Sequence, residues 1–342
     1  MKKHLTRGAL AAAALAAAGA AQAQSSVTLA GLADMYVGSM RMAGDATRRN
    51  TAGSGGMTTS WIGVKGVEDL GGGLQVGFNF TSFLRMGSGD SGRFTGDTFW
   101  SRDANITLGG GFGTVTLGRW MAPNFLPTIL FNPFGDSFAF SPLVLHANVS
   151  LYNGTGWTGT SPADTGWANQ VAYTTPGFGG LKATLHYQFR DSAASGHNVG
   201  ADVMYFSGPL GLTAFYERAQ LGNPVAATYA DGSTRTNWMV GGSYDFQVVK
   251  LFLTHGQARN DVSEVKIKAT QLGASAPLGP GKLMASVAQS KNSGLDKTRR
   301  TIAVGYDYTL SKRTDVYANL MHDRITDYKS GTSYAVGIRH RF

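Results

Sequence analysis

The sequence predicts an all-β fold: a 16-stranded antiparallel transmembrane β-barrel with an inward-folded long third extracellular loop. Three observations favour this fold. Short segments of alternating apolar and polar residues recur along the chain, separated by Gly-rich turns. The chain contains 47 Gly, 13 Tyr, 18 Phe and 6 Trp, a composition typical of barrels with aromatic girdles. It ends in an alternating segment whose last residue is Phe342.

Residues 1–23 are predicted to be a cleaved secretion signal. A basic start precedes an apolar stretch, and the small residues Ala21 and Ala23 provide the cleavage pattern. A membrane helix is the alternative, but the apolar stretch is shorter than the ~17 residues that such a helix needs. We therefore expect export through the periplasm to the outer membrane, with residues 24–342 forming the barrel.

The composition also excludes several classes of site. The chain has no cysteine, so neither disulfides nor thiolate metal sites are possible, and we expect no cofactor or metal. Its formal net charge is +9. Nucleic-acid binding is one explanation of a basic chain, but no basic helix or zinc-ligand set is present. Cationic residues that line a pore explain the charge equally well, so no nucleic-acid partner is expected.

The strands follow one another in a regular order. From Leu74 to Thr81, apolar side chains such as Phe78 and Phe80 alternate with polar ones, as expected of a wall between lipid and water. Short hairpin turns are predicted at Asp69–Gly72, Gly109–Phe112, Pro176–Gly179, Ser207–Leu210, Phe246–Val248, Pro277–Gly281 and Leu310–Arg313. Seven such turns, together with pairing of the two terminal strands, give sixteen strands. A closed barrel of ~16 strands encloses a water-filled lumen.

The C-terminal segment is a strong sign of such a barrel. Tyr334, Val336 and Phe342 share one face, and Arg339 and Arg341 share the other. A soluble sandwich or propeller would show the same alternation, but the aromatic residues near strand ends and the terminal Phe342 favour a membrane wall. We expect Phe342 to serve in barrel closure and assembly.

Residues 121–165 interrupt the regular strands. They are rich in Pro, Gly and aromatic residues and show no sustained periodicity. Loops beyond ~15 residues are usually functional or disordered, and the many aromatic residues argue against disorder. We expect this segment to fold into the barrel mouth as a constriction loop.

These motifs together resemble the trimeric general porins of beta-proteobacteria, the Neisseria, Bordetella and Burkholderia type. The matching stretches are Val27-Thr28-Leu29, Gly63 to Gly71, Phe112 to Arg119, Leu272 to Pro277, Leu310 to Thr314 and Gly337 to Phe342. The resemblance implies a homotrimer of 16-stranded barrels in outer-membrane lipid, each with its third extracellular loop as the constriction.

The resemblance also implies arginines on the wall opposite the inward loop. Arg102 matches one of these positions, but Trp61 and Gly166 stand where two others are expected. Thr81 stands where an acidic residue is expected. These departures predict a weaker electric field across the constriction. Trp61 would offer an apolar or stacking surface there.

The alternation of side chains places several candidates. Trp61 and Lys65 share a face that we expect to line the lumen, although Trp61 could instead anchor a strand end at the interface and Lys65 could lie near the periplasmic turn. Arg102 is in step with Ile106, which should face lipid, so its place in the pore requires a bulge near Asp103.

The remaining candidates carry charge. Asp136 is expected either to face the basic wall or to tie the loop to itself. Arg119 is expected to bond loop carbonyls as a positioning residue. Lys266, Lys268 and Arg339 are expected to point into water or the lumen and to favour anions, although each could equally be a solvated residue near headgroups.

The predicted function is a passive diffusion channel for ions and small hydrophilic solutes, with a mild preference for anions. No nucleotide, metal or paired-residue catalytic motif occurs in a suitable context, so we expect no enzyme. The alternatives are a channel that prefers aromatic or organic-acid solutes, an outer-membrane hydrolase with a Ser/His/acid cluster at its rim, and a barrel whose loops serve surface recognition.

Overall fold

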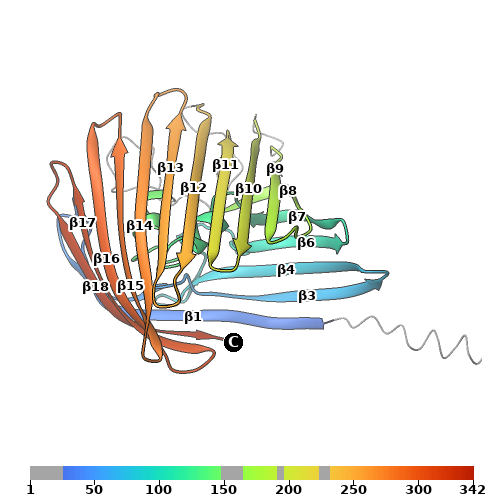
Figure 1. Ribbon diagram of the computed structural model, residues 1–342, viewed down its shortest axis with the longest axis horizontal. Helices are drawn as coiled ribbons and strands as arrows, with labels where there is room; N and C mark the ends of the chain where they lie inside the picture. The colour runs from blue at the N-terminus through green and yellow to red at the C-terminus, as the bar shows by residue number, and fades with distance from the viewer. Residues whose placement is uncertain (1–25, 148–164, 191–195, 223–231) are drawn as a thin grey trace, which may run out of the picture.

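The computed structural model describes residues 26–147, 165–190, 196–222 and 232–342. The predicted signal 1–23 and residues 148–164 of the predicted constriction loop lie outside the described residues. Figure 1 shows the long strands curving around a common interior, with the helical segment 125–147 inside the curve.

The strands in chain order are β1 (Ser26–Met40), β2 (Arg49–Ser54), β3 (Trp61–Gly71), β4 (Leu74–Arg85), β5 (Asp90–Ser91), β6 (Asp103–Gly110), β7 (Gly113–Met121), β8 (Gly166–Thr174), β9 (Leu181–Gln188), β10 (Asn198–Ser207), β11 (Leu210–Ala219), β12 (Arg235–Asp245), β13 (Lys250–Asn260), β14 (Lys266–Leu278), β15 (Gly281–Asn292), β16 (Lys297–Thr309), β17 (Thr314–Ile325) and β18 (Gly331–Arg341). The described helices are α2 (Phe125–Leu130) and α3 (Pro142–Ala147).

These strands form one closed antiparallel wall. β1 pairs with β18 from Leu32 opposite Arg341 to Ser39 opposite Tyr334, so the sheet has no free edge there. β2 and β3 both pair with β1 and together make one interrupted wall strand. β5 pairs only with β4, through two residues. The described residues therefore build sixteen wall strands, and the predicted 16-stranded antiparallel barrel is confirmed.

All seven predicted hairpin turns are present at one end of the barrel, where they join β3 to β4, β6 to β7, β8 to β9, β10 to β11, β12 to β13, β14 to β15 and β16 to β17. The longer connections lie at the other end. In outer-membrane barrels the short turns are periplasmic and the long loops extracellular. We use this orientation below.

The two faces of the wall differ in polarity. In β17, Asn319, Met321 and Asp323 are buried, whereas the alternating Leu320 and His322 are exposed. The exposed outer face includes many large apolar side chains, such as Leu272 and Val336, as a lipid-facing band requires. Among the described residues, no helix has the length and apolar character needed to cross a membrane.

A bulge in β7 changes the direction of one side chain. The register with β8 shifts between Gly118 and Trp120, and Gly118 has φ +117, a conformation that favours glycine. Without the shift, Arg119 would point outward in step with the exposed Leu117. Instead Arg119 is buried on the inner side.

Candidate functional site

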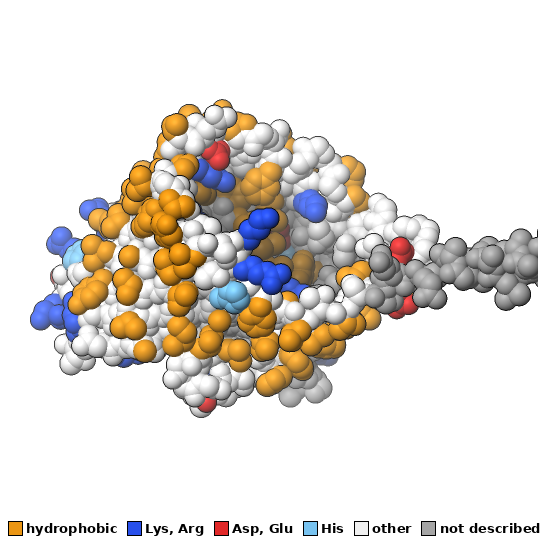
Figure 2. All heavy atoms as spheres, turned by 90° about the horizontal axis from the view of Figure 1, so that it is seen from below, with side chains coloured by type: hydrophobic (Ala, Val, Ile, Leu, Met, Phe, Trp, Pro, Cys, Tyr) orange, Lys and Arg blue, Asp and Glu red, His pale blue; other side chains and the backbone are white. Residues whose placement is uncertain are grey.

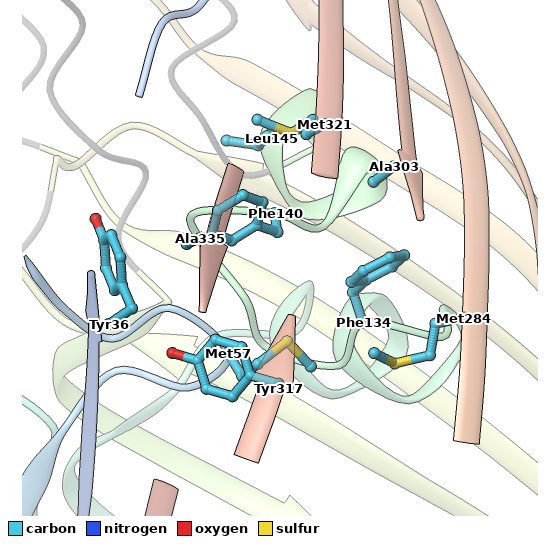
Figure 3. Close-up of a cluster of buried hydrophobic side chains, with 10 residues drawn as sticks. All are labelled: Tyr36, Met57, Phe134, Phe140, Leu145, Met284, Ala303, Tyr317, Met321 and Ala335. Atoms are coloured by element: carbon cyan, nitrogen blue, oxygen red, sulfur yellow. The ribbon is translucent and has the colours of Figure 1, made fainter. Parts of the chain in front are cut away.

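The described part of the 121–165 segment, residues 121–147, packs against the inner side of the wall. A buried apolar cluster joins it to β1 and to β15–β18 (Figure 3). Phe134 and Phe140 supply the segment's aromatic rings to this cluster, and both are at most 1% exposed. Burying a side chain of this size stabilises by roughly 1.5–3 kcal/mol, so the two rings alone hold the segment firmly.

Small residues on the wall allow this close approach. A Cβ atom at Gly273 would lie 2.6 Å from Cδ of Pro133, and one at Gly305 would lie 3.0 Å from Cε1 of Phe134. Glycine at these two wall positions lets the segment lie directly on β14 and β16.

Three polar contacts anchor the segment at separate points. The side-chain amide of Asn124 donates to both carboxylate oxygens of Glu217 in β11, each at 3.0 Å. The Ser137 hydroxyl donates to the Gly56 carbonyl at 2.7 Å. Nε2 of His146 lies 2.7 Å from the Thr301 hydroxyl in β16. The segment is thus fixed to strands far apart around the barrel.

His146 is fully buried at the end of α3. Burial lowers the pKa of His146 to about 3, and the nearby Arg299 charge acts in the same direction against the opposing charge of Asp323. The imidazole is therefore neutral at physiological pH. Arg299 in turn donates to the Leu145 carbonyl at 3.4 Å, which adds a second contact between α3 and β16.

The wall on β3, β4 and β6 carries a cluster of basic and aromatic side chains. The Arg102 guanidinium lies 4.4 Å from the Trp61 ring centroid, and Nζ of Lys65 lies 5.0 Å from it. In the register of β3 and β4, Lys65 is opposite Asn79 and Gly63 is opposite Thr81. Asn79 and Thr81 lie on the face opposite to that of Phe78 and Phe80, whose rings point outward. Trp61, Lys65 and Arg102 therefore lie together on the inner side.

The alternation of β6 does not decide on which face of the wall Arg102 lies. β6 begins at Asp103, so Arg102 precedes the strand and is not bound by its alternation. Its guanidinium donates to Asp103 at 2.7 Å, and its backbone amide donates to the Thr81 carbonyl at 3.2 Å. The Thr81 hydroxyl also donates to Asp103, at 2.7 Å. The acidic residue expected at position 81 is thus absent, but the Asp103 carboxylate of the neighbouring strand lies beside Thr81.

Arg119 has the contacts of a positioning residue. Its Nε donates to the Ser101 carbonyl at 2.8 Å and one terminal nitrogen donates to the Gly166 carbonyl at 3.3 Å. Both carbonyls belong to the ends of long connections. Gly166 therefore accepts a hydrogen bond from a guanidinium at a position where the family resemblance implied an arginine.

Asp136 lies on the inward segment and accepts a hydrogen bond from the Thr58 hydroxyl at 2.9 Å. Burial raises the pKa of Asp136, while the Thr58 hydrogen bond and the positive charges of Arg339 and Arg102 oppose that rise. The carboxyl is therefore tied to the β2–β3 connection and also lies within electrostatic reach of Arg102 on the basic wall. The bond to Thr58 ties the segment to another part of the chain and not to itself, and the role of Asp136 opposite the basic wall stays a prediction.

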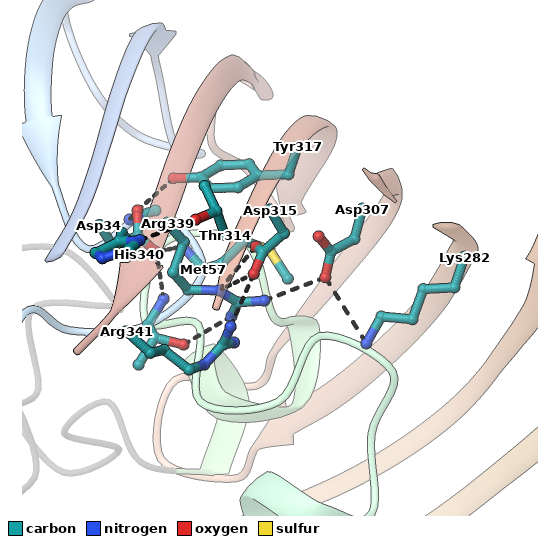
Figure 4. A network of polar contacts seen from close by, with 12 residues as sticks. Asp34, Met57, Lys282, Asp307, Thr314, Asp315, Tyr317, Arg339, His340 and Arg341 are labelled. Carbon is teal, nitrogen blue, oxygen red and sulfur yellow. Dashed lines mark hydrogen bonds and ion pairs between the residues drawn. The ribbon is translucent and has the colours of Figure 1, made fainter. Parts of the chain in front are cut away.

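The expectation that Arg339 supplies a free lumen charge is wrong. Arg339 is on the inner side, but it is only 8% exposed. It lies 2.9 Å from Asp315 and 3.1 Å from Asp307 (Figure 4). It also donates to the Thr58 hydroxyl at 2.9 Å. Two carboxylates, which are shared with Lys282 and Arg341, hold its guanidinium in the wall, so it stabilises the wall and does not face the passage.

Lys266 and Lys268 are also not in the lumen, contrary to expectation. In β14 the buried side chains are Ile267 and Gln271, and these face inward. The two lysines are exposed on the opposite face, which they share with the 55% exposed Leu272. The two lysines do lie on the face opposite Ile267, as the alternation predicted. The inner face is the one that carries Ile267, which packs with Ala43 and Ile325.

The terminal residue completes the closure of the barrel. The Gly31 amide donates to the Phe342 carbonyl at 3.0 Å, and the Phe342 amide donates to the Gly31 carbonyl at 3.1 Å. Its ring lies on the exposed outer face. The backbone of Phe342 therefore pairs with β1, and its expected role in closure and assembly stays a prediction.

A cavity of about 630 Å³ lies between the inward segment and the wall of β1, β2 and β4. Its basic residues are Arg49, Arg85 and Arg93, which the sequence analysis did not single out. They lie at the ends of strands and in connections, where alternation gives no signal. Phe125 and Phe138 line it from the segment. Seen from the side of the short turns, Figure 2 shows basic side chains gathered in a hollow of the molecule, with apolar side chains over the outer wall.

Two of these arginines are paired. Arg85 lies 3.2 Å from Asp90, and Arg93 lies 2.8 Å from Asp97. Burial alone would raise the pKa of Asp97, but its hydrogen bonds and ion pair with Arg93 outweigh burial and lower it. Asp97 is therefore ionised at neutral pH and fixes Arg93 at the rim of the cavity.

The comparisons with known proteins agree with this geometry. A family described as Gram-negative porin matches residues 9–328. Outer membrane porin protein 32 of Delftia acidovorans is 33% identical, with both chains covered completely. An outer membrane porin of Bordetella pertussis is 30% identical, again over 100% of both chains.

Solved structures show the same barrel. An anion-selective porin from Comamonas acidovorans superposes with a TM-score of 0.79 at 28% identity, covering 93% of this chain and 100% of the other. OmpT of Vibrio cholerae in its trimer form shares the fold, with a TM-score of 0.65, 16% identity and coverage of 93% and 99%.

The hydrolase alternative is excluded, since the family consists of channels and not enzymes. The sixteen-stranded closed wall, the lumen-facing basic cluster and the full-length relatives lead to one conclusion. The chain belongs to the Gram-negative porin family and is a β-barrel channel of the outer membrane.

Proposed function

We propose that the channel passes small anions in preference to cations, and that the 121–165 segment narrows the passage. The observation that carries the first part is the inner cluster of Trp61, Lys65 and Arg102, whose two cations lie 5.0 and 4.4 Å from one aromatic ring. Rings or clusters of like charge at a constriction favour counter-ion entry. The likeness to a porin whose title calls it anion-selective supports the same sign.

The distribution of contacts supports a passage beside this cluster. α3 contacts β14, β15 and β16, and α2 contacts β10 and β11. The two helices of the segment thus lie against the β10–β16 side of the lumen. The cavity lined by Arg49 and Arg85 lies on the other side, so a permeating ion would pass between the segment and a basic wall. Exclusion by width and an electrostatic bias then suffice, without chemistry or a cofactor.

The selectivity is tested by the reversal potential across a planar bilayer under a tenfold KCl gradient. We expect an anion-selective potential for the native channel and a several-fold lower anion preference for the double variant Lys65→Gln/Arg102→Gln, because both substitutions remove a lumen charge. The matched control is Lys266→Gln/Lys268→Gln, which removes two outward charges and should leave the potential unchanged. A cation-selective native channel would overturn the proposal.

The constriction role is tested with introduced thiols, since the chain has no cysteine. Ala139 lines the cavity from the segment, whereas Ala318 is exposed on the outer face of β17. A charged methanethiosulfonate reagent should reduce the conductance of Ala139→Cys and leave Ala318→Cys unaffected. Full labelling of Ala139→Cys without a change in conductance would show that the segment does not narrow the passage.

A preference for organic acids is a second candidate, favoured by the mixed lining of the cavity. Tyr36, Phe83 and Phe138 line the cavity together with Arg49 and Arg85. Such a lining suits a solute with an apolar body and a carboxylate. Reversal potentials with benzoate and acetate in place of chloride test this candidate: it requires benzoate to permeate better than its larger size predicts.

We also propose that the channel is a homotrimer. A concave outer surface lined by Val37, Ala52, Leu320 and Val336 joins the first and last strands of the barrel. OmpT of Vibrio cholerae, which shares this fold, has been solved in a trimer form. Analytical ultracentrifugation in detergent should give three chains per particle, and conductance should close in three equal steps. A single-chain particle with one step would contradict the proposal.

A further inference from the structure

The point where the inward segment leaves the wall is held by three polar side chains. Gln170 on β8, His186 on β9 and Asp202 on β10 are all buried on the inner side. Nδ1 of His186 lies 2.8 Å from Oε1 of Gln170, and its Nε2 lies 2.9 Å from Oδ1 of Asp202. We call these three residues the foot cluster, because Gln170 also contacts the end of β7, where the segment begins.

The contacts of Gln170 fix the orientation of its side-chain amide. Nε2 of Gln170 lies 3.2 Å from the Trp120 carbonyl. It also lies 3.4 Å from the carbonyls of Met121 and Trp167. An amide nitrogen donates and an amide oxygen accepts, so the reverse orientation would put an oxygen against three carbonyl oxygens. Oε1 of Gln170 therefore faces His186 as an acceptor.

This orientation decides the protonation state of His186. One ring nitrogen faces the amide oxygen of Gln170, and the other faces the carboxylate of Asp202. A neutral imidazole carries a single N–H and donates to only one of two acceptors, whereas an imidazolium donates to both. The foot cluster is therefore complete only when His186 carries its second proton.

The surroundings of the ring favour the cation. The His186 ring stacks on Trp120, with centroids 5.7 Å apart and an angle of 16° between the planes, and an indole face attracts a cation. The Asp202 carboxylate compensates the charge, and its Oδ2 atom is buried with no hydrogen-bond partner among the described residues. Because a buried carboxylate needs a paired cation, Asp202 and His186 stabilise each other in the charged form.

Other charged side chains of the surrounding strands do not take the place of Asp202. On the inner face they are Arg119 on β7, Glu217 on β11 and Lys182 on β9 itself, and β8 has none. Arg119 donates to two backbone carbonyls, and Glu217 accepts from two side-chain amides. Lys182 is exposed at the short-turn end of β9. Within the part of the chain that the structure describes, Asp202 is thus the carboxylate that contacts His186.

Gln170 bridges an interruption of the sheet. Between β7 and β8 the register passes from Gly118 opposite Gln170 to Trp120 opposite Trp167. Within this shift Asn169 has φ +48, a left-handed conformation that is uncommon outside glycine. An interrupted ladder leaves backbone carbonyls in need of other donors, and Nε2 of Gln170 is a donor to three of them. The exit of the segment from β7 thus depends on the orientation of one amide.

We propose that the imidazolium of His186 fixes the exit of the inward segment from β7, and that loss of its proton at alkaline pH releases this exit. Because Asp202 keeps the proton on Nε2, the proton is lost from Nδ1. Nδ1 then turns a lone pair toward the Gln170 oxygen, and the two acceptors repel, so the amide no longer holds the first carbonyls of the segment. His186 is thus a positioning residue of the constriction. Its effect on permeation rests on the proposed narrowing by the 121–165 segment, whereas the release itself does not.

The protonation state is measured by heteronuclear NMR of the folded protein with isotopically labelled histidine, and the spectrum of His186→Gln assigns the His186 signals. We expect both ring nitrogens to carry a proton at pH 6 and Nδ1 to have lost its proton at pH 10. A His186 ring with an unprotonated nitrogen at pH 6 would overturn the proposal.

Release of the exit is measured by alkylation of an introduced thiol at Ala122, which is buried and whose amide donates to the Thr165 carbonyl at 2.9 Å. The rate for Ala122→Cys is divided by the rate of the same thiol in a His186→Gln background, which cancels the pH dependence of the thiol itself. We expect this ratio to rise about tenfold between pH 6 and pH 10, because the docked state binds the proton that the released state gives up.

The matched control is His255→Gln, which removes an exposed imidazole on the outer face of β13 and should leave the NMR signals of His186 and the labelling ratio unchanged. Asp202→Asn is a second test variant that keeps the shape of the foot cluster without its carboxylate, so labelling should begin to rise at a lower pH. A labelling ratio that does not change with pH would overturn the proposal. Neither measurement uses conductance, so a failure of the proposed narrowing would leave both results as they are.

Discussion

The wall beneath the 121–147 segment and the wall facing it, on β3, β4 and β6, hold basic residues in different surroundings. Beneath the segment, Arg299 is buried and lies 2.9 Å from Asp323, and Arg339 lies between two carboxylates. On the facing wall, Lys65 and Arg102 rest on Trp61 and are partly exposed. Asp103 is the carboxylate bonded to Arg102 there.

This difference follows from the position of the segment. Where it covers the wall, water is excluded, and a cation persists only when it is paired with a carboxylate. Where it leaves the wall open, water solvates a cation, which then acts on passing ions. A basic residue that faces inward therefore contributes to selectivity only on the open side, and on the covered side it contributes to stability.

The largest effect is expected from Arg339. The substitution Arg339→Met removes the buried cation that bridges Asp307 and Asp315 and leaves them only the exposed Lys282, 3.9 Å from Asp307, and Arg341, 2.9 Å from Asp315. Removing one partner from a buried ion pair typically costs about 3–5 kcal/mol. We expect a clear drop in the urea midpoint and in the temperature of the heat-induced gel shift.

Arg341 provides the matched control for this prediction. It also lies 2.9 Å from Asp315, but its side chain is 45% exposed. Surface pairs contribute only about 0–1 kcal/mol, so Arg341→Gln should barely move the midpoint. If Arg339→Met and Arg341→Gln lost stability equally, the distinction between cations that the segment covers and cations that water solvates would be wrong.

A smaller effect is expected on the docking of the 121–147 segment when the pH is lowered. The pKa of His146 is about 3 in the docked segment and 6.5 in a released one. Between these values only the released state binds the proton, so docking has its full strength above pH 6.5 and weakens as the pH falls toward 3. The loss is about 1.4 kcal/mol for each pH unit, or about 2 kcal/mol at pH 5.

The thiol of Val144→Cys reports release of the segment, because Val144 is fully buried in α3. Relative to a His146→Gln background, we expect labelling at pH 5 to be at least tenfold faster than at pH 7.5. The background comparison removes the pH dependence of the thiol itself and of Asp136, whose raised pKa acts in the opposite direction. Identical pH profiles in the two backgrounds would rule out His146 as the titrating group.

The sequence predicted the barrel well because its signals are local. Each hairpin turn is marked by its own residues, and each strand by its own alternation, so errors at one strand do not spread to the next. The terminal alternation from Tyr334 to Phe342 was also read correctly, with Arg339 on the inner face. Recognition of the inward segment depended on its length, its Pro, Gly and aromatic content, its lack of periodicity and the family resemblance.

The site was less predictable because it depends on which face of each strand is turned toward the lumen and on which side chains of other strands it contacts there. Alternation divides Lys266 and Lys268 from Ile267, but it does not tell which side is the lumen when both have apolar residues. The pairing of Arg339 with Asp307 and Asp315 joins three strands and has no local signature. Arg102 was uncertain because the first residue of β6 could not be fixed from alternation alone.

The smallest effect is expected at Trp61, which stands where the family resemblance implied an arginine. The substitution Trp61→Arg would place a third cation beside Lys65 and Arg102 on the open wall. Water and salt screen charges there, so we expect only about a twofold rise in anion preference at low salt and a smaller rise at 1 M KCl.

The uncharged variant Trp61→Leu separates the charge of the new residue from loss of the ring. Removing the ring leaves Lys65 and Arg102 without the aromatic surface that holds them, but it leaves their charges in place. Its reversal potential should therefore stay close to the native value while Trp61→Arg moves toward stronger anion selectivity. A fall in anion preference for Trp61→Arg would mean that the added cation displaces Lys65 and Arg102 from the passage, and that Trp61 is what keeps the open wall basic.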